Sequence, residues 1–269
     1  MNASPYRLVT FNVWGDYFGN PPCERDERQV ATLKGLEPDL IALQEITSNY
    51  WASRLMDGLS DEFEAVGCGM GHDGGNLFTP LLFRKTRFSL LEKGGFLFHP
   101  ELDKSKGAAW AALRDERTGR KVVAFSTHFW WRIDGVGDDY IRLENARRLH
   151  SELSAVAERN AAAIVGGGDL NAELDASCIA ELARLGWQSG RDSAPCSDRR
   201  HTQHGDPVRG ADGAYHGTDL DHAKKTMMID HVFHSHGGIR PCEFCVVTTG
   251  GVEDLSDHYP LAFDFQLRS

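Results

Sequence analysis

The sequence lacks the features of a membrane or secreted protein. No stretch of its 269 residues reaches the ~18 consecutive apolar residues that a membrane-spanning helix requires. Residues 1–5 are short and polar, and we expect no signal peptide there. The six cysteines are scattered, without the spacing of a disulfide framework. These absences favour a cytoplasmic protein with reduced thiols and no membrane partner.

The sequence also lacks an excess of positive charge. It has 29 Lys and Arg residues against 39 Asp and Glu residues, which gives a formal net charge of −10. Nucleic-acid affinity depends mainly on basic side chains that contact phosphates, so this balance argues against a general nucleic-acid-binding protein. It does not exclude one, because a basic rim can lie on an acidic body.

Internal repeats, low-complexity tracts and linkers are absent as well. Short apolar runs alternate with stretches of helical periodicity, which predicts one α/β domain over residues 1–269, and we expect a monomer. The predicted strands are residues 6–13, 39–43, 81–83, 121–125, 162–165, 227–233 and 259–265. The predicted helices are residues 24–36, 139–158 and 176–185, and residues 191–225 are predicted to form a long irregular loop.

Polar residues lie at the ends of several of these strands, at the edges of the apolar runs. They are Asn12, Glu45, His128, Asp169, Asn171, Asp257 and His258. Each one alone is ordinarily a turn residue that forms local hydrogen bonds. Carboxylates are rarely buried unless they are paired or bind a metal, so strand ends that converge would form a single site. Oxygen atoms of Asn12, Glu45 and Asp257 suit a hard cation such as Mg²⁺ or Mn²⁺, and His–Asp pairs suit proton transfer near neutral pH.

Asp230 lies inside a predicted strand, on the same face as Met228 and Val232. This position predicts a partly buried carboxylate, which needs a partner. We expect His258 to be that partner. The pair would hold one imidazole tautomer and favour the charged form of the ring.

Six short segments resemble the motifs of the endonuclease/exonuclease/phosphatase superfamily. They occur in that superfamily's order and span nearly the whole chain: TFNVWG (10–15), LQE (43–45), STHF (126–129), GGDLNAE (167–173), MIDHVF (228–233) and SDHYPL (256–261). The resemblance implies a deoxyribonuclease I-like four-layer α/β sandwich, in which two mixed β-sheets pack face to face with helices outside. It also implies a hydrolase that uses Mg²⁺ or Mn²⁺ to cleave a phosphate ester by attack of an activated water on phosphorus.

The resemblance assigns roles to the residues around the implied cation and the attacking water. Glu45 would be the principal metal ligand, supported by Asn12 and Asp257. Asp169 would orient or deprotonate the water, and Asn171 would hold a phosphate oxygen. These roles agree with the need for a cation and amide donors near the negative charge that builds on the phosphate oxygens.

The two histidines also receive roles from the resemblance. His258, paired with Asp230, would contact the scissile phosphate, and His128 would contact another phosphate oxygen or assist the leaving group. Many relatives carry a Gly–Glu pair shortly before the central strand, where this chain has Gly75 and Asn76. The support expected for one active-site histidine is therefore missing or replaced by a carboxamide.

Four further residues are candidates for substrate binding: Trp130, Trp131, Arg142 and His216. The two tryptophans follow the STHF segment and would stack on a base or sugar; alternatively, one packs inward and the other covers a loop. Arg142 matches a position that is often basic in the resembled family. His216 lies in a short YHG segment, similar to one in relatives, within a loop whose basic residues would either grip a phosphate or be solvated.

Three functions remain open from the sequence. The first is a phosphodiesterase or phosphatase acting on a small or medium phosphate ester, which the acidic charge favours. The second is a DNA or RNA endonuclease or exonuclease of the same superfamily. Such an enzyme needs a row of basic side chains beside the site to contact the phosphates. The third is a non-catalytic binding protein, but a scaffold has no physical need for so many ionisable residues at its strand ends.

Overall fold

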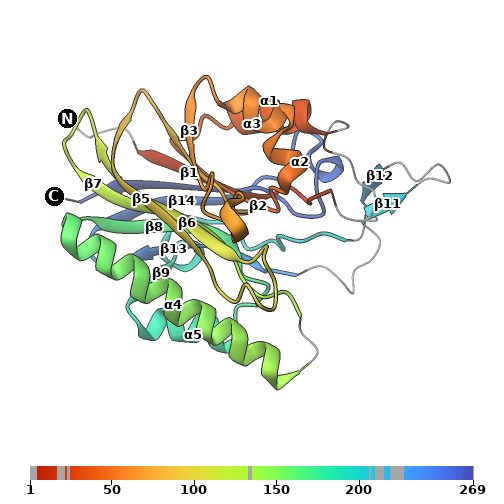
Figure 1. Ribbon diagram of the computed structural model, residues 1–269. Coiled ribbons are helices and arrows are strands. Elements are labelled where there is room, and N and C mark those ends of the chain that lie inside the picture. The colour runs from red at the N-terminus through yellow and green to blue at the C-terminus, as the bar shows by residue number, and fades with distance from the viewer. Residues whose placement is uncertain are drawn as a thin grey trace.

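Two β-sheets form the centre of the molecule (Figure 1). The computed structural model describes residues 5–16, 22, 25–132, 135–205, 207–209, 215–218 and 227–268. The seven-stranded sheet has the order β10 (Cys196–Ser197), β14 (Ile239–Val246), β15 (Leu261–Leu267), β1 (Tyr6–Asn12), β2 (Leu40–Gln44), β4 (Leu81–Arg84) and β3 (Phe63–Val66). The six-stranded sheet has the order β5 (Phe88–Leu97), β6 (Gly107–Asp115), β7 (Lys121–His128), β8 (Ala163–Asp169), β13 (Asp230–Ser235) and β9 (Trp187–Ser189). Both sheets are mixed, because β1–β2 and β7–β8 are parallel whereas most other pairs are antiparallel.

Helices cover the outer face of each sheet. The seven-stranded sheet is covered by α1 (Asp26–Gly35), α2 (Ser48–Trp51) and α3 (Arg54–Leu59), and the six-stranded sheet by α4 (Val136–Asn160) and α5 (Ser177–Arg184). Shorter elements are η3 (His72–Gly74), α6 (Gly190–Ser193), η4 (Val252–Asp254) and a separate ribbon of β11 (Pro207–Arg209) and β12 (Tyr215–Thr218). Among the described residues, no helix combines the length and the apolar character needed to cross a membrane.

Three apolar clusters correspond to the three interfaces between these layers. Leu8 and Phe263 of one sheet pack with Ala124 and Val165 of the other between the sheets. Leu149 of α4 belongs to the cluster that packs against the six-stranded sheet, and the remaining cluster packs α1 to α3 against the seven-stranded sheet. The structure therefore confirms the predicted four-layer α/β sandwich.

The interior between the sheets changes from apolar to polar toward one edge. Along β1, alternate residues face this interior, because side chains of a strand alternate between its faces. Leu8 lies in the apolar core, Thr10 follows it, and Asn12 is the last residue of the strand on that face. At the level of Thr10, the Gln44 amide donates to Ser126 Oγ over 3.2 Å and so joins the two sheets. The buried functional groups lie one step beyond this hydrogen-bonded row.

The predicted strands and helices are present, with ends that differ by a few residues, but the prediction for residues 191–225 is partly wrong. That segment contains the end of α6 as well as β10, β11 and β12. Arg191 is buried, and its guanidinium donates to the carbonyl oxygens of Asp198 and Arg200. These side-chain-to-backbone bonds order the start of the segment. Strands β3, β5, β6 and β9 had not been predicted.

Gly168 of β8 provides a test of how tightly this sheet is packed. A Cβ atom at Gly168 would lie 1.8 Å from the carbonyl oxygen of Thr127 in β7, which is backbone and cannot move aside. We expect Gly168→Ala to lower the free energy of unfolding by about 1–3 kcal/mol, measured by urea denaturation. Gly137→Ala in α4 is the control, because a Cβ there meets nothing within 4 Å. Equal stability of Gly168→Ala and wild type would contradict the close approach.

Candidate active site

The polar strand ends meet at one edge of the sandwich. Asn12, His128 and Asp169 are the last residues of β1, β7 and β8, and Glu45 directly follows β2. Asp230 is the first residue of β13, which runs antiparallel to β8, so Asp230 is paired in register with Asp169. The predicted convergence of these side chains follows from the strand directions in the two sheets.

Asp169 is the most heavily contacted carboxylate of this edge, and only 2% of it is exposed. Its Oδ2 accepts a hydrogen bond from Asn12 Nδ2 at 3.0 Å and lies 3.3 Å from His128 Nε2 and 3.9 Å from His258 Nε2. Burial alone would raise the pKa of the Asp169 carboxyl. The nearby His128, His258 and Lys106 outweigh burial and hold that pKa well below its usual range. Asp169 is therefore ionised at neutral pH.

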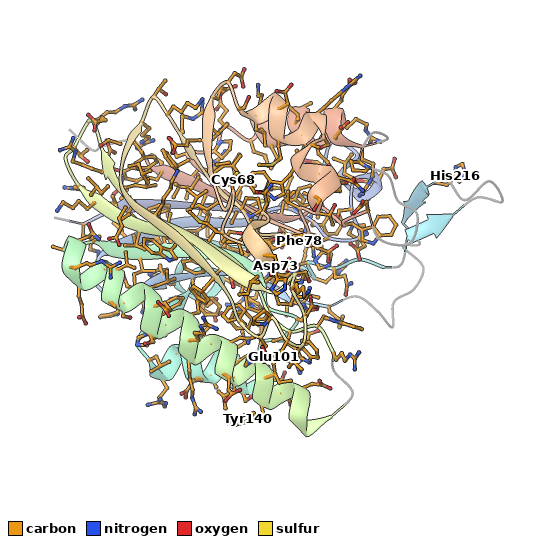
Figure 2. All side chains as sticks on the ribbon, in the orientation of Figure 1. Cys68, Asp73, Phe78, Glu101, Tyr140 and His216 are labelled. Atoms are coloured by element: carbon orange, nitrogen blue, oxygen red, sulfur yellow. The ribbon has the colours of Figure 1, made fainter. Side chains whose placement is uncertain are left out.

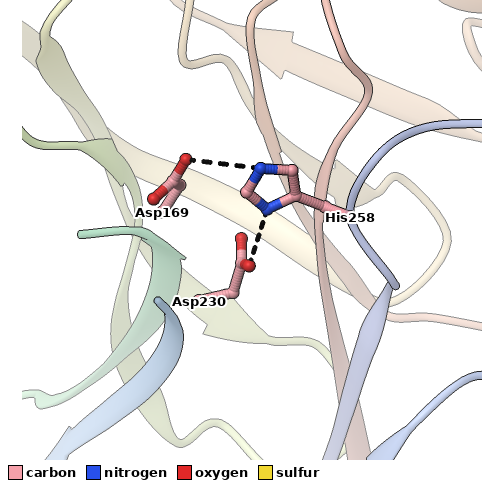
Figure 3. A group of neighbouring side chains, drawn as sticks. All are labelled: Asp169, Asp230 and His258. Carbon is pink, nitrogen blue, oxygen red and sulfur yellow. Dashed lines mark hydrogen bonds and ion pairs between the residues drawn. The ribbon is translucent and has the colours of Figure 1, made fainter. Parts of the chain in front are cut away.

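Asp230 and His258 form the predicted buried pair (Figure 3). His258 Nδ1 lies 2.7 Å from Asp230 Oδ2, and both side chains are almost fully buried. Burial lowers the pKa of His258, but the carboxylates of Asp230, Asp257 and Asp169 raise it well above its ordinary value. One ligand atom from each of Asp169, Asp230 and His258 lies within 4.8 Å of the others, a spacing that a metal ion could share. A protonated imidazole has no free lone pair, so the trio is better described as one hydrogen bond, from His258 to Asp230, and one longer ion pair, from His258 to Asp169.

Glu45 and Asp257 form a second acidic group, in which the two carboxylates repel one another. Glu45 accepts hydrogen bonds from Gly15 N at 2.7 Å and from Asn12 Nδ2 at 3.2 Å. Burial and the charge of Glu45 raise the pKa of Asp257 to about 6, although His258 opposes this shift. A divalent cation would relieve this repulsion, and an oxygen donor set of this kind fits Mg²⁺ or Mn²⁺.

Hydrogen bonds to the backbone hold the side chains of Asp169 and Asn171 in place. Asn171 has a left-handed backbone (φ 49°), and its backbone N–H donates to Asp169 Oδ1 at 2.8 Å. The Asn171 side-chain amide donates to the carbonyl oxygen of Phe129 at 3.2 Å. An amide nitrogen carries two N–H groups, so one N–H of this side chain remains for a ligand.

Lys106 is a site residue that the sequence did not reveal. It precedes β6 and is 8% exposed, and its Nζ lies 2.8 Å from His128 Nε2. Burial lowers the pKa of Lys106, although the carboxylates of Glu45 and Asp169 oppose this shift. Asn76, where the family resemblance leads us to expect a glutamate, accepts a hydrogen bond from Gly69 N in its own loop.

The two tryptophans predicted to bind substrate have different surroundings. Trp130 is buried, and its indole N–H donates to Asp138 Oδ1 at 2.7 Å. Trp131 is 52% exposed, and the guanidinium of Arg132 lies 5.3 Å from its ring centroid. Of these two tryptophans, Trp131 is therefore the one whose ring is accessible to a ligand.

Arg142 and His216, the other two candidates for substrate binding, have different surroundings. The guanidinium of Arg142 is buried and bonds to the Arg132 carbonyl oxygen and to Asp139. His216 is exposed on β12, and Figure 2 shows it on the ribbon that projects beyond the two large sheets.

A sequence model of the endonuclease/exonuclease/phosphatase family matches residues 9–258, and the chain belongs to this family. Among solved structures, it is similar to an endonuclease/exonuclease/phosphatase from Bacteroides vulgatus (22% identity, TM-score 0.75, 99% of this chain and 100% of that chain). It is also similar to a mannosyl-6-phosphatase of Bacteroides thetaiotaomicron VPI-5482 (16%, 0.73, 98% and 100%). A third similar structure is D. rerio TDP2 complexed with a single-strand DNA product (17%, 0.73, 98% and 100%). No curated protein matches the sequence.

The raised pKa of His258 predicts a specific pH dependence of stability. The protonated ring stabilises the fold fully below its unfolded-state pKa of about 6.5, and this stabilisation is lost as the pH rises through the higher folded-state pKa. We expect Asp230→Asn to lower the pKa of His258 and to reduce the free energy of unfolding by about 1–3 kcal/mol below pH 6.5.

The difference between wild type and Asp230→Asn should shrink above neutral pH. Urea unfolding across the pH range measures it, and an imidazole NMR titration reports His258 directly. Asp254→Asn, at an exposed ion pair with Arg28, is the control. A difference that does not change with pH would mean that His258 is not the titrating group.

Proposed function

We propose that the chain is a divalent-metal-dependent phosphoesterase that acts on a small or medium phosphate ester through an activated water. The observation that carries the proposal is the buried Asp169 carboxylate between His128 and His258, next to the repelling pair Glu45 and Asp257. This arrangement combines an acceptor for a water molecule, cationic donors and a place for a cation in one edge of the sandwich.

The cation would be held by Glu45 and Asp257, with Asn12 in support. Asn12 Oδ1 accepts from Trp14 N at 3.0 Å and keeps a second lone pair, while its Nδ2 joins Glu45 to Asp169. When bound, a divalent cation supplies positive charge for the oxygens of the reacting phosphate.

Asp169 and His258 would act on the water and on the phosphate, respectively. A carboxylate whose pKa lies below its usual range is a weak base, so Asp169 is better suited to accepting a hydrogen bond from the water and orienting it. The protonated His258 ring would donate to a non-bridging phosphate oxygen, with its tautomer and orientation fixed by Asp230. Asn171 would donate its remaining amide N–H to a second oxygen.

His128 and Lys106 lie together next to Asp169. The ammonium of Lys106 lies close to both ring nitrogens of His128, at 2.8 and 3.2 Å. A cationic N–H donor stabilises negative charge on an oxygen of a phosphate ester more strongly in a water-poor site than in water. We assign these two residues to a phosphate oxygen or to the leaving group.

A nuclease remains the second candidate, and the exposed pair of Trp131 and Arg132 favours it. A guanidinium beside an exposed indole provides a surface on which a base stacks. The formal charge of −10 argues for a small substrate instead, because a long nucleic acid needs a row of basic side chains. A nucleotide or nucleoside phosphate ester would satisfy both observations.

The test of the proposed function is hydrolysis of p-nitrophenyl phosphate and bis-p-nitrophenyl phosphate with Mg²⁺, Mn²⁺ or EDTA. We expect metal-dependent turnover that falls about 10²–10⁴-fold in Asp169→Asn, because the water loses its charged acceptor. Asp175→Asn, an exposed aspartate nearby in the chain, is the matched control. Unchanged turnover in Asp169→Asn, or no turnover on these esters, nucleotides, DNA and RNA, would refute the proposal.

Lys106 allows activity to be separated from stability. We expect Lys106→Met to lower kcat about 10²-fold, because one donor to the reacting phosphate is lost. Stability should stay equal or rise, since burial disfavours the charged form of Lys106 in the fold. Kinetics and urea unfolding measure the two effects, with exposed Lys104→Met as control. A variant that is less stable yet fully active would assign Lys106 to packing alone.

A further inference from the structure

Arg25 is a charged side chain without a role in the proposed phosphoesterase reaction, yet it is only 1% exposed. It directly precedes α1, where a basic side chain would ordinarily extend into water. Its side chain does not cap the helix. It is one of the largest fully buried side chains among the described residues. Burial of a guanidinium is costly unless its donors are satisfied, so the identity of its partners is informative.

The guanidinium of Arg25 joins two loops that are far apart in the sequence. Nη1 donates to the carbonyl oxygens of Val13 at 2.9 Å and Leu255 at 2.6 Å. Nη2 donates to the carbonyl oxygen of Trp14 and to the Tyr50 hydroxyl, both at 2.6 Å. The ring centroids of Trp14 and Tyr50 lie 5.2 and 5.8 Å from the guanidinium carbon. One planar group therefore holds the loop after β1 against the loop before β15.

Gln29, one turn further along α1, repeats the same connection. Its amide donates to the carbonyl oxygens of Val13 at 3.2 Å and Leu255 at 3.0 Å, and its side chain is fully buried. Two side chains from one face of α1 thus bond to the same pair of carbonyls. Together with Arg25, Gln29 forms what we call the α1 bridge.

Each loop held by the α1 bridge carries or supports a carboxylate of the proposed cation site. In the first loop, Gly15 N donates to Glu45 Oε2 at 2.7 Å. In the second, Leu255 is followed by Ser256 and Asp257, and Ser256 Oγ donates to the carbonyl oxygen of Asn12 at 2.6 Å. The two carboxylates repel, so their separation in the fold depends on what holds the two loops together.

We infer that Arg25 is a positioning residue for the cation site: by joining the loop after β1 to the loop before β15, it fixes the separation of Glu45 and Asp257. The affinity for a divalent cation follows from that separation. The inference rests on the proposed function, because it assigns the cation to these two carboxylates. Lysine cannot replace arginine here, since its donors extend from a single atom and cannot span three carbonyls and a hydroxyl in one plane.

The test is direct Mn²⁺ binding to the full chain, measured by titration calorimetry after removal of metal with EDTA and dialysis. We expect Arg25→Lys to raise the Kd for Mn²⁺ about tenfold, the usual scale for loss of a residue that orients metal ligands. Arg28→Lys is the control: Arg28 lies on the same helix, is 53% exposed and bonds to Gly251 of the neighbouring loop. Its Kd should equal that of wild type.

Unfolding in EDTA distinguishes a positioning role from a purely structural one. If Arg25→Lys unfolds more easily but binds Mn²⁺ with the wild-type Kd, the inference is overturned. Gln29→Leu is the second variant, in case Arg25→Lys does not fold. It removes half of the α1 bridge and should raise the Kd by a smaller factor, and an unchanged Kd in this variant would also count against the inference.

Glu45→Gln separates failure of the inference from failure of the proposed function. If wild type binds Mn²⁺ and Glu45→Gln does not, the cation site is established and the Arg25 result stands on its own. If wild type and Glu45→Gln bind Mn²⁺ equally or not at all, the proposed cation site is wrong, and the role of Arg25 falls with it.

Discussion

The buried charge of Asp169 is the interaction on which the rest of the site depends. A carboxylate at this depth is tolerated only because His128, His258 and Lys106 lie close to it. Two of these groups are in turn fixed: His258 by Asp230, and Lys106 by its position directly before β6. Removal of one member changes the electrostatic surroundings of the others, so the site is a single electrostatic unit rather than a set of independent residues.

Much of the fold and of the site could be predicted because both follow from strand periodicity. The residues that end apolar runs must lie at a sheet edge, and alternation puts Asn12 on the face of Leu8 and Thr10. Asp230 was found in the same way, since a carboxylate inside an apolar strand needs a partner, and His258 is that partner. The family resemblance added the order of the motifs, and the match over residues 9–258 confirms it.

The residues that were missed depend on strand register and on contacts between distant segments. Lys106 reaches His128 because Gly107 is paired with His128 across the β6–β7 hairpin, and the alanine-rich β6 gives no periodic signal of its own. Arg25 precedes a helix, where local sequence predicts exposure, and only the packing of α1 against the sheet buries it. Trp130 bonds to Asp138, eight residues later, so an aromatic pair in the sequence does not reveal which ring stays open.

The left-handed backbone conformations of the site occur at residues other than glycine, so glycines in the sequence do not mark them. Trp14, Glu45 and Asn171 all have left-handed backbones, with φ of 54°, 63° and 49°. Such conformations cost about 1–3 kcal/mol each in residues other than glycine and persist only where surrounding bonds impose them. Backbone N–H groups at the turns of Trp14 and Asn171 donate to site side chains: Trp14 N to Asn12, Gly15 N to Glu45 and Asn171 N to Asp169. The same bonds orient the oxygens proposed to bind the cation and the water, so strain and ligand geometry have a common origin.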